Sequence, residues 1–265
     1  MSAHDVFNRA AAYEPYVGRW SRRIAPDFLD WLAAAPGGRW LDVGCGTGAL
    51  SEAILARTRP AAVAGIDLSS ALIEHVTASI TDPRASFSVG SATQLDFANG
   101  EFDAVASALV LNFVPDPQLA TAEMRRVVRA GGTVGAYVWD YAGGMQMMRV
   151  FWDAAIELDP AAAALDEGSR FKICTAPALR SCFESAGLDG VEVLALDCPM
   201  TFSDFDDYWT PFLSGQAPAP AYAMSLDEAR RETLRELIRS RLPVEKGGEI
   251  RMVSRAWAVK ARSAP

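Results

Sequence analysis

Short apolar stretches alternate with amphipathic stretches along the first 140 residues of the chain. The apolar stretches have the length of strands, and the segments between them carry apolar residues at helical spacing. The pattern predicts strands over residues 39–43, 61–66, 85–89, 102–111 and 133–139, and helices over residues 49–58, 70–80 and 118–129. Strands that alternate with helices form β-α-β units, so we expect a parallel, doubly wound α/β sheet with right-handed crossovers.

The alternation breaks after Tyr141 and later resumes. Helices are predicted over residues 145–158, 176–186 and 225–241, the last with Ser225 as its N-cap and Glu228 completing a capping box. Two further strands, at residues 191–196 and 249–260, raise the total to seven. We therefore expect a single domain with a Rossmann-like, seven-stranded, mostly parallel sheet. Its predicted parts are an N-terminal helical segment (1–36), a core (37–141), two inserts that form a helical cap with that segment (142–175 and 202–243), and the remaining core (176–201 and 244–265).

Composition narrows the class of protein. The chain has 265 residues, of which 50% are hydrophobic and 22% charged, so it can bury a sizeable core. No apolar run reaches the roughly 20 residues of a membrane helix, and the N-terminus lacks the pattern of a secretory signal, so we expect no membrane insertion and a cytoplasmic location. The net charge of −8 argues against a nucleic-acid partner. Four cysteines without a C-x-x-C pair, and two histidines, predict no metal site.

The chemistry-bearing segment is the glycine-rich turn after the first predicted strand. It reads Leu-Asp-Val-Gly-Cys-Gly-Thr-Gly over residues 41–48, and Asp67 follows Gly46 by 21 residues, at the end of the second strand. Glycines allow ligand atoms to approach the backbone, and a carboxylate at the second strand can accept hydrogen bonds from ribose hydroxyls. The pattern therefore indicates an adenosine-type cofactor. The glycine spacing alone leaves NAD open, since alanine at position 49 is a known replacement for the third glycine of the dinucleotide motif.

Several motifs in order resemble those of class I S-adenosylmethionine (SAM)-dependent methyltransferases. The glycine turn is followed by Gly-Ile-Asp-Leu-Ser at residues 65–69, Phe-Asp-Ala-Val at 102–105, and Arg-Arg-Val-Val-Arg-Ala-Gly-Gly at 125–132. The segment over residues 13–22 is similar to the lead segment of the small-molecule methyltransferases related to ubiquinone and menaquinone biosynthesis. The resemblance covers residues 13–140 well and the remainder only in strand order.

By position, the resemblance implies a set of cofactor-binding residues. Gly44, Gly46 and Gly48 would form the turn that holds the methionine part of SAM, with Asp42 near its amino group; Asp67 would bind the ribose, Leu68 would pack on the adenine, Ala92 and Thr93 would lie at the adenine edge, and Ser107 and Ala108 would border the methionine part. Many relatives have an aspartate where this chain has Ser91, so the usual carboxylate to the adenine is missing or is supplied by Gln94 or Asp96.

Aromatic residues are concentrated in the segments that meet at the carboxyl edge of such a sheet, where ligands bind. We expect some of them to line a substrate pocket, namely Tyr16, Trp20, Trp139 and Trp209. Arg19, Arg22 and Arg23 are open to two interpretations, a solvated helix face or a site for an anionic substrate. No residue is assigned a catalytic role.

The sequence therefore predicts a SAM-dependent methyltransferase that acts on a small molecule and releases S-adenosyl-L-homocysteine (SAH). The attacked atom (O, N, C or S) and the oligomeric state are left open. Two alternatives remain at this stage: a SAM-binding regulator or complex subunit without catalysis, and an NAD-dependent oxidoreductase.

Overall fold

A computed structural model of the chain describes residues 14–264, so the first thirteen residues of the expected N-terminal helical segment lie outside the described part. The elements, in chain order, are η1 (Glu14–Gly18), α2 (Arg19–Leu32), β1 (Arg39–Val43), α3 (Ala49–Arg57), β2 (Ala62–Asp67), α4 (Ser70–Ser79), β3 (Ala85–Val89), β4 (Phe102–Ala108), α5 (Pro117–Val127), β5 (Val128–Trp139), α6 (Gln146–Leu158), η2 (Pro160–Ala164), α7 (Glu167–Arg170), α8 (Ala176–Ser185), β6 (Leu188–Phe202), α9 (Phe205–Trp209), η3 (Thr210–Leu213), α10 (Pro218–Ser225), α11 (Glu228–Arg241) and β7 (Ile250–Ser263).

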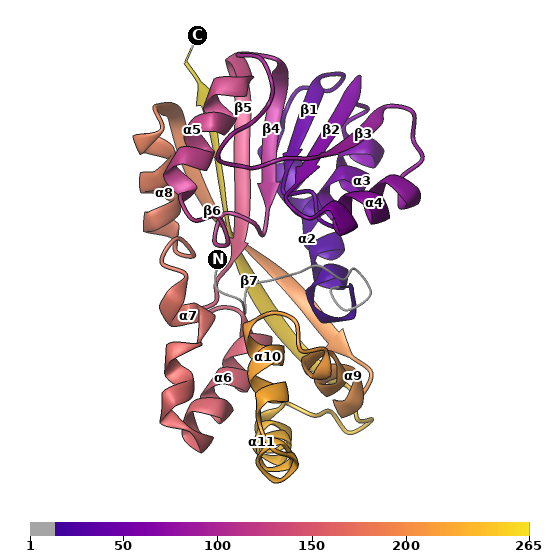
Figure 1. Cartoon of the computed structure of the whole chain (residues 1–265), viewed down its shortest axis with the longest axis vertical. Coiled ribbons are helices and arrows are strands. Elements are labelled where there is room, and N and C mark those ends of the chain that lie inside the picture. Colours follow the sequence, from indigo (N-terminus) through magenta and orange to yellow (C-terminus); the bar gives the residue numbers. More distant parts are fainter. Residues whose placement is uncertain (1–13, 265) are drawn as a thin grey trace.

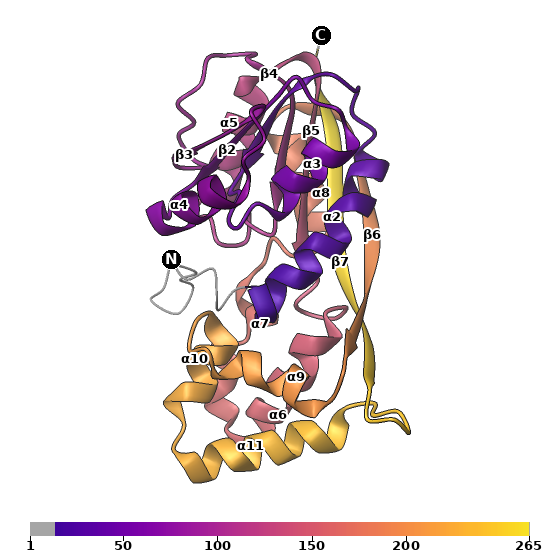
Figure 2. The same cartoon turned by 90° about the vertical axis from the view of Figure 1, so that its right-hand side faces the viewer.

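The seven strands form one sheet in the order β3-β2-β1-β4-β5-β7-β6. The first five pair in parallel, whereas β7 is antiparallel to both of its neighbours. Helices cover both faces, with α2 and α3 on one side and α5 and α8 on the other (Figures 1 and 2). The predicted seven-stranded, mostly parallel, Rossmann-like α/β sheet is confirmed.

The first long helix packs against the sheet through one face. Ile24, Ala25, Phe28 and Leu32 of α2 recur at helical spacing and are buried. The ring of Phe28 lies 4.9 Å from that of Tyr137 in β5. This packing fixes the start of α2, and of η1 before it, beyond the carboxyl ends of the parallel strands.

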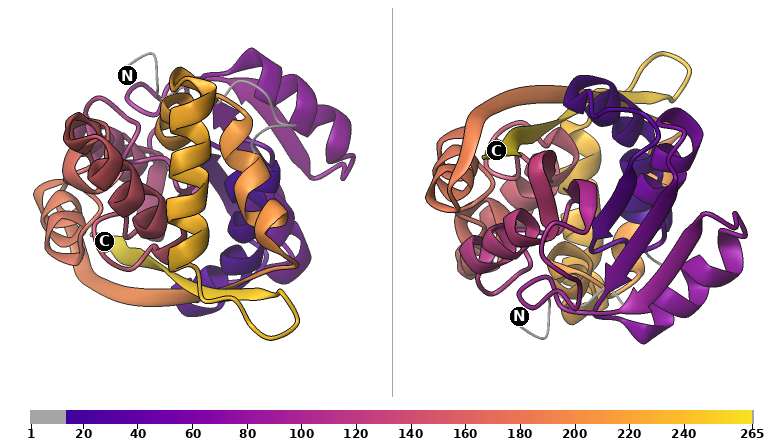
Figure 3. Two further views of the ribbon diagram at one scale, coloured as in Figure 1. Left: turned by 90° about the horizontal axis from the view of Figure 1, so that it is seen from below. Right: turned by 90° about the horizontal axis from the view of Figure 1, so that it is seen from above.

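The last two strands are longer than the pattern predicts. β6 has 15 residues and β7 has 14, and they pair from Leu188–Ser263 to Phe202–Ile250. Their far halves leave the common sheet and run down to the helices α6, α9, α10 and α11, which gather below the carboxyl ends of the parallel strands (Figure 1). Seen from below, α11 crosses the outer side of this group (Figure 3). We refer to residues 142–175 and 202–243 as the cap.

Two local predictions were wrong. β4 ends at Ala108 rather than at residue 111, because Leu109 adopts a left-handed backbone (φ 61°) that turns the chain out of the sheet. The helix predicted from Ser225 begins at Glu228, and its N-cap is Asp227, whose side chain accepts from the Arg230 N–H at 2.8 Å. Ser225 instead ends α10 and donates to the Tyr222 carbonyl. Among the described residues no helix is long and apolar enough to cross a membrane.

Candidate functional site

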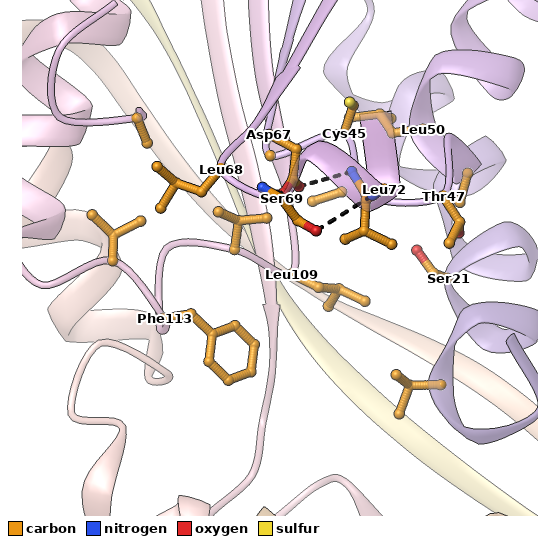
Figure 4. Close-up of a pocket in the computed structure, with 18 of the residues that line it drawn as sticks. Ser21, Cys45, Thr47, Leu50, Asp67, Leu68, Ser69, Leu72, Leu109 and Phe113 are labelled. Atoms are coloured by element: carbon orange, nitrogen blue, oxygen red, sulfur yellow. Dashed lines mark hydrogen bonds between the residues drawn. The ribbon is translucent and has the colours of Figure 1, made fainter. Parts of the chain in front are cut away.

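A cavity of about 500 Å³ lies between the carboxyl ends of the parallel strands and the cap. Its volume falls within the range of small-molecule and cofactor sites, about 300–1,000 Å³. One half is formed by the loops that follow β1, β2, β3 and β4, and the other by η1, the start of α2, the end of β5 and cap residues. Figure 4 shows Asp67, Ser69 and Thr47 along one edge of this cavity, with Leu109 and Phe113 below them.

The glycine-rich turn is held against the end of β2. The backbone N–H groups of Gly44 and Cys45 both donate to the carbonyl of Ile66 at 2.8 Å, so the chain reverses tightly. Gly44 and Gly46 have positive φ angles of 78° and 53°. A Cβ on Gly44 would meet Val110 at 2.4 Å, whereas a Cβ on Gly46 would meet no protein atom within 4 Å. Gly46 therefore borders open space, as a residue that lies against a ligand must.

Asp67 joins this turn to the start of α4. Its Oδ2 accepts from the Gly46 N–H at 3.1 Å and its Oδ1 from the Ser69 N–H at 2.9 Å. Burial raises the pKa of Asp67, and these backbone hydrogen bonds oppose the rise. The carboxylate is thereby fixed in orientation on the cavity wall.

Asp42 is a fully buried carboxyl group on the cavity wall. Its Oδ2 accepts from the Ser51 hydroxyl at 2.7 Å, while its Oδ1 is buried without a hydrogen-bond partner. Burial raises the pKa of Asp42 to about 7, and the nearby Asp67 charge adds to the rise. A buried acceptor without a partner is costly, so this oxygen is suited to a ligand that brings a donor or a positive charge.

The N-terminal segment closes over the glycine turn through a small polar cluster. The Thr47 hydroxyl donates to Glu14 Oε1 at 2.5 Å, and Arg22 donates to Glu14 at 3.1 Å and to the Thr47 carbonyl at 3.3 Å. Arg22 also pairs with Glu52 of α3. Burial raises the pKa of Glu14, but the hydrogen bonds from Arg22 and Thr47 outweigh it and hold that pKa below its ordinary value.

Ten of the fourteen residues predicted for the site line this cavity: Asp42, Gly44, Gly46, Asp67, Leu68, Ala92, Thr93, Ala108, Tyr16 and Trp139. Leu68 is 64% exposed, which leaves an apolar surface free beside the opening. Ser91 also lines the cavity, and its hydroxyl lies 2.9 Å from that of Thr93. Gln94 and Asp96, the expected replacements for the adenine carboxylate, are not among the lining residues.

Four predicted residues are not among those that line the cavity. Gly48 is the N-cap of α3, and a Cβ there would meet Ile80 and Val76 at 2.7 Å. The Ser107 hydroxyl is buried in the sheet, where it donates to the Val43 carbonyl at 2.8 Å.

The other two, Trp20 and Trp209, pack within the protein. The Trp20 ring contacts Phe202 edge-on at 5.2 Å, and the Trp209 ring stacks on Phe205 and Phe212. Both indoles have ring-centroid distances typical of aromatic packing, so packing accounts for these two residues without a ligand.

The predicted arginine cluster does not reach the cavity. Arg19 pairs with Asp207 at 2.8 Å and lies over the Trp20 ring, Arg22 belongs to the Glu14 cluster, and Arg23 is exposed. Among the described lining residues there is no arginine, lysine or histidine. The interpretation of these arginines as an anion site therefore loses its support.

The cavity is also lined by residues that the sequence did not indicate. Leu109 and Phe113 line it from the loop after β4. In the half beneath the cap, called the acceptor half below, Met148 of α6 lines the cavity, and its sulfur accepts from the Tyr16 hydroxyl at 3.2 Å. Glu167 reaches the same half from α7. The left-handed turn at Leu109 is visible only in the structure, and nothing in the sequence around Glu167 distinguishes it from a solvated acidic loop.

Comparison with known proteins agrees with this geometry. A family model described as a methyltransferase domain matches residues 41–135. The chain is 35% identical over 138 residues to a demethylmenaquinone methyltransferase of a Roseiflexus species, a match that covers 45% of the chain and 58% of that relative. It is 34% identical over 138 residues to a ubiquinone biosynthesis O-methyltransferase of Aromatoleum aromaticum, covering 50% of the chain and 56% of that relative. The matched segment thus spans little more than half the length of these relatives.

Among solved structures, a phosphoethanolamine N-methyltransferase of Haemonchus contortus in complex with S-adenosyl-L-methionine superposes with a TM-score of 0.61. The superposition covers 100% of this chain and 60% of that one, at 16% sequence identity. At this identity the likeness concerns the fold.

Proposed function

We propose that this chain, whose residues 41–135 match a family model described as a methyltransferase domain, is a class I enzyme that transfers the methyl group of SAM to a small-molecule acceptor. The observation that carries the proposal is the Asp67 carboxylate, fixed by the Gly46 N–H on the wall of a cavity that continues beneath the cap. A ribose-binding acid beside an open glycine turn fits an adenosine cofactor, and the cavity beyond it leaves room for an acceptor.

The residues present fit the chemical groups of SAM. The unpartnered Asp42 Oδ1 suits the cationic amino group of the methionine part, and the exposed Leu68 suits the flat face of adenine. The complete proposed set is Asp42, Gly44, Gly46, Asp67, Leu68, Ala92, Thr93 and Ala108. When bound, SAM supplies a methyl group on a positively charged sulfur, which is a good leaving group. The protein's contribution is then to hold the acceptor atom in line with that methyl group, and such alignment can lower the barrier by several kcal/mol.

The acceptor half favours a small, largely apolar molecule. Its described walls include Tyr16, Trp139, Tyr141, Met145 and Met148, all buried, and no cationic side chain lines it. The two relatives above are named for demethylmenaquinone and for ubiquinone biosynthesis, which agrees with an apolar acceptor. None of the comparisons supports an oxidoreductase or a non-catalytic regulator.

The test is isothermal titration of the full chain with SAM, SAH and NAD. Asp67→Ala is compared with Asp116→Ala, a matched control because Asp116 also accepts a backbone N–H at a helix start, that of Leu119 at 2.9 Å, but lies outside the cavity. Loss of the Asp116 N-cap costs about 1 kcal/mol of stability, and loss of the Asp67 hydrogen bonds to the Gly46 and Ser69 N–H groups costs a similar amount. Only Asp67→Ala should weaken SAM binding, by about 1–3 kcal/mol or roughly 5- to 150-fold. Absence of SAM and SAH binding to the folded wild-type chain would refute the proposal, and binding of NAD alone would favour the oxidoreductase.

A further inference from the structure

Glu167 is a buried carboxyl group on the cap side of the cavity. It is 3% exposed, lines the cavity, and begins the short helix α7. Its Oε2 accepts from the indole N–H of Trp152, a residue of α6 that is fully buried. The hydrogen bond from Trp152 of the cap thus fixes the Glu167 side chain, which borders the space where an acceptor would lie.

The surroundings of Glu167 leave its charge poorly compensated. Burial raises its pKa to about 8; the Trp152 hydrogen bond and the Arg170 charge oppose the rise, and Asp166 adds to it. From other elements, Tyr16 and Cys174 interact electrostatically with it, and both are uncharged at neutral pH because burial raises their pKa values.

Two arginines, Arg149 and Arg170, lie close to Glu167 or to its neighbour Asp166. Arg149 of α6 pairs with Asp166 at 2.8 Å, and the Arg170 guanidinium lies over the Phe171 ring. Neither lines the cavity. An ionised Glu167 would therefore gain most from a cation placed inside the cavity, and the sulfonium of SAM is such a cation.

We propose that Glu167 accepts the proton of the acceptor molecule during methyl transfer and restricts the acceptor to uncharged molecules that carry a hydroxyl group. This inference rests on the proposed function. The acceptor oxygen bonds to the methyl carbon, the carbon–sulfur bond breaks with its electron pair on sulfur, and the hydroxyl proton passes to the Glu167 carboxylate. The products are a methyl ether, SAH and a neutral Glu167, which later returns its proton to solvent.

The charges on the cavity wall fit this assignment. An ionised Glu167 accepts a hydrogen bond from a hydroxyl group and repels a carboxylate, and no described lining residue supplies a positive charge to offset that repulsion. A positioned proton acceptor typically raises the rate of a reaction 10²- to 10⁴-fold, and we expect a contribution of this size from Glu167.

The first measurement is the ratio of the Kd values for SAH and SAM, by isothermal titration from about pH 6 to 9.5. SAM carries the sulfonium charge and SAH does not, whereas Asp42 and Asp67 face parts that both ligands share. If the sulfonium lowers the pKa of Glu167 by about one unit, the preference for SAM rises about tenfold across this range. Glu167→Gln should abolish the rise. Glu157→Gln, an exposed cap glutamate paired with Arg241, is the matched control and should keep it.

Trp152→Phe provides a second variant in case Glu167→Gln does not fold. It removes the hydrogen bond that stabilises the ionised carboxylate, so the midpoint of the rise should move to higher pH, which a purely structural loss would not produce. A pH-independent ratio in the wild-type chain, or an equal rise in Glu167→Gln, overturns the assignment. Failure of SAM and SAH to bind at all is a different result, and it overturns the proposed function instead.

The second measurement tests the acceptor class with the SAH-loaded chain at about pH 8.5. The probes are 4-ethylphenol, which is neutral, and 4-hydroxybenzoate, which is similar in size but anionic, observed by saturation-transfer NMR competition. The neutral phenol should bind at least tenfold more tightly than the benzoate, and Glu167→Gln should narrow this difference. Equal or tighter binding of the benzoate, or no binding of either probe at millimolar concentration, contradicts the proposed acceptor class.

Discussion

Alanine substitutions at two glycines distinguish the effect of backbone strain from the effect of a contact between the glycine-rich turn and a ligand. Gly46 lies in the turn on the cavity wall with φ 53°, and Gly37 lies in the loop between α2 and β1 with φ 80°. A Cβ at either position meets no protein atom within 4 Å. Gly46→Ala and Gly37→Ala therefore impose the same kind of backbone strain, but only the first adds a methyl group next to the cavity.

The expected magnitudes differ accordingly. A left-handed backbone costs a residue with a Cβ about 1–2 kcal/mol, so both variants should lose that amount of stability, or roughly 2–8 °C of Tm for a chain of this size. In Gly46→Ala the methyl group also crowds the bound ligand. Overpacking costs about 1–3 kcal/mol, which corresponds to a loss of roughly 5- to 150-fold in SAM affinity. Gly37→Ala should bind SAM as the wild-type chain does.

Thermal unfolding and isothermal titration with SAM, on the same preparations, give both quantities. The reasoning fails if Gly46→Ala binds SAM with wild-type affinity, since the ligand then does not approach the backbone there. It fails equally if Gly37→Ala loses the same affinity, because the loss would then follow from backbone strain rather than from contact with the ligand.

Two other predictions concern the buried acid and the N-terminal closure. Burial raises the pKa of Asp42 from 3.8 to about 7, so the folded state binds the Asp42 proton more tightly than the unfolded state does. The protonated carboxyl group therefore contributes up to about 4 kcal/mol to stability below pH 4, and this contribution is lost as the pH rises through 7. Asp42→Asn should therefore resist urea better than the wild-type chain at pH 8 and equally at pH 4; equal midpoints at both pH values would contradict this. Arg22→Ala breaks a half-buried ion pair with Glu14 and the pair that links α2 to Glu52 of α3, so the free energy of unfolding should fall by about 1 kcal/mol, while stopped-flow release of SAM becomes several-fold faster. Arg57→Ala breaks an exposed pair between α3 and Asp30 of α2 away from the cavity and should leave release unchanged; an equal effect of both variants would refute a closing role.

The parallel part of the sheet could be predicted because its strands are short apolar or alternating segments bounded by turn residues. β1 and β3 match the predicted bounds at both ends, and β2 is shifted by one residue. The predicted strand 249–260 corresponds to β7 (Ile250–Ser263), whereas β6 (Leu188–Phe202) extends well beyond the predicted strand 191–196 at both ends. Residues 197–202 of β6 pair with β7 beyond the common sheet and alternate between buried and exposed.

The cofactor half of the site could be predicted for a similar reason. Asp42, Gly44, Gly46 and Asp67 all belong to one strand–turn–helix–strand unit, in which a parallel sheet brings successive carboxyl ends to the same edge. The function proposed for them follows from their place in that unit, with little dependence on the rest of the chain. Ser107 belongs to the same edge, but its side chain is used to bind the neighbouring strand, and residue spacing does not distinguish the two faces of one strand end.

The acceptor half depends on contacts between distant parts of the chain. The Tyr16–Met148 hydrogen bond joins residues 132 apart, and the Arg19–Asp207 pair joins residues 188 apart. Whether an aromatic residue of these segments faces the cavity or packs inward, as Trp139 and Trp20 respectively do, is decided by these long-range contacts and leaves no local pattern. The matched methyltransferase domain also ends at residue 135, before the cap begins. The choice of acceptor must therefore depend on the side chains of the cap. Among the cap residues that line the cavity, Glu167 is the ionisable one, so the acceptor must be compatible with its negative charge.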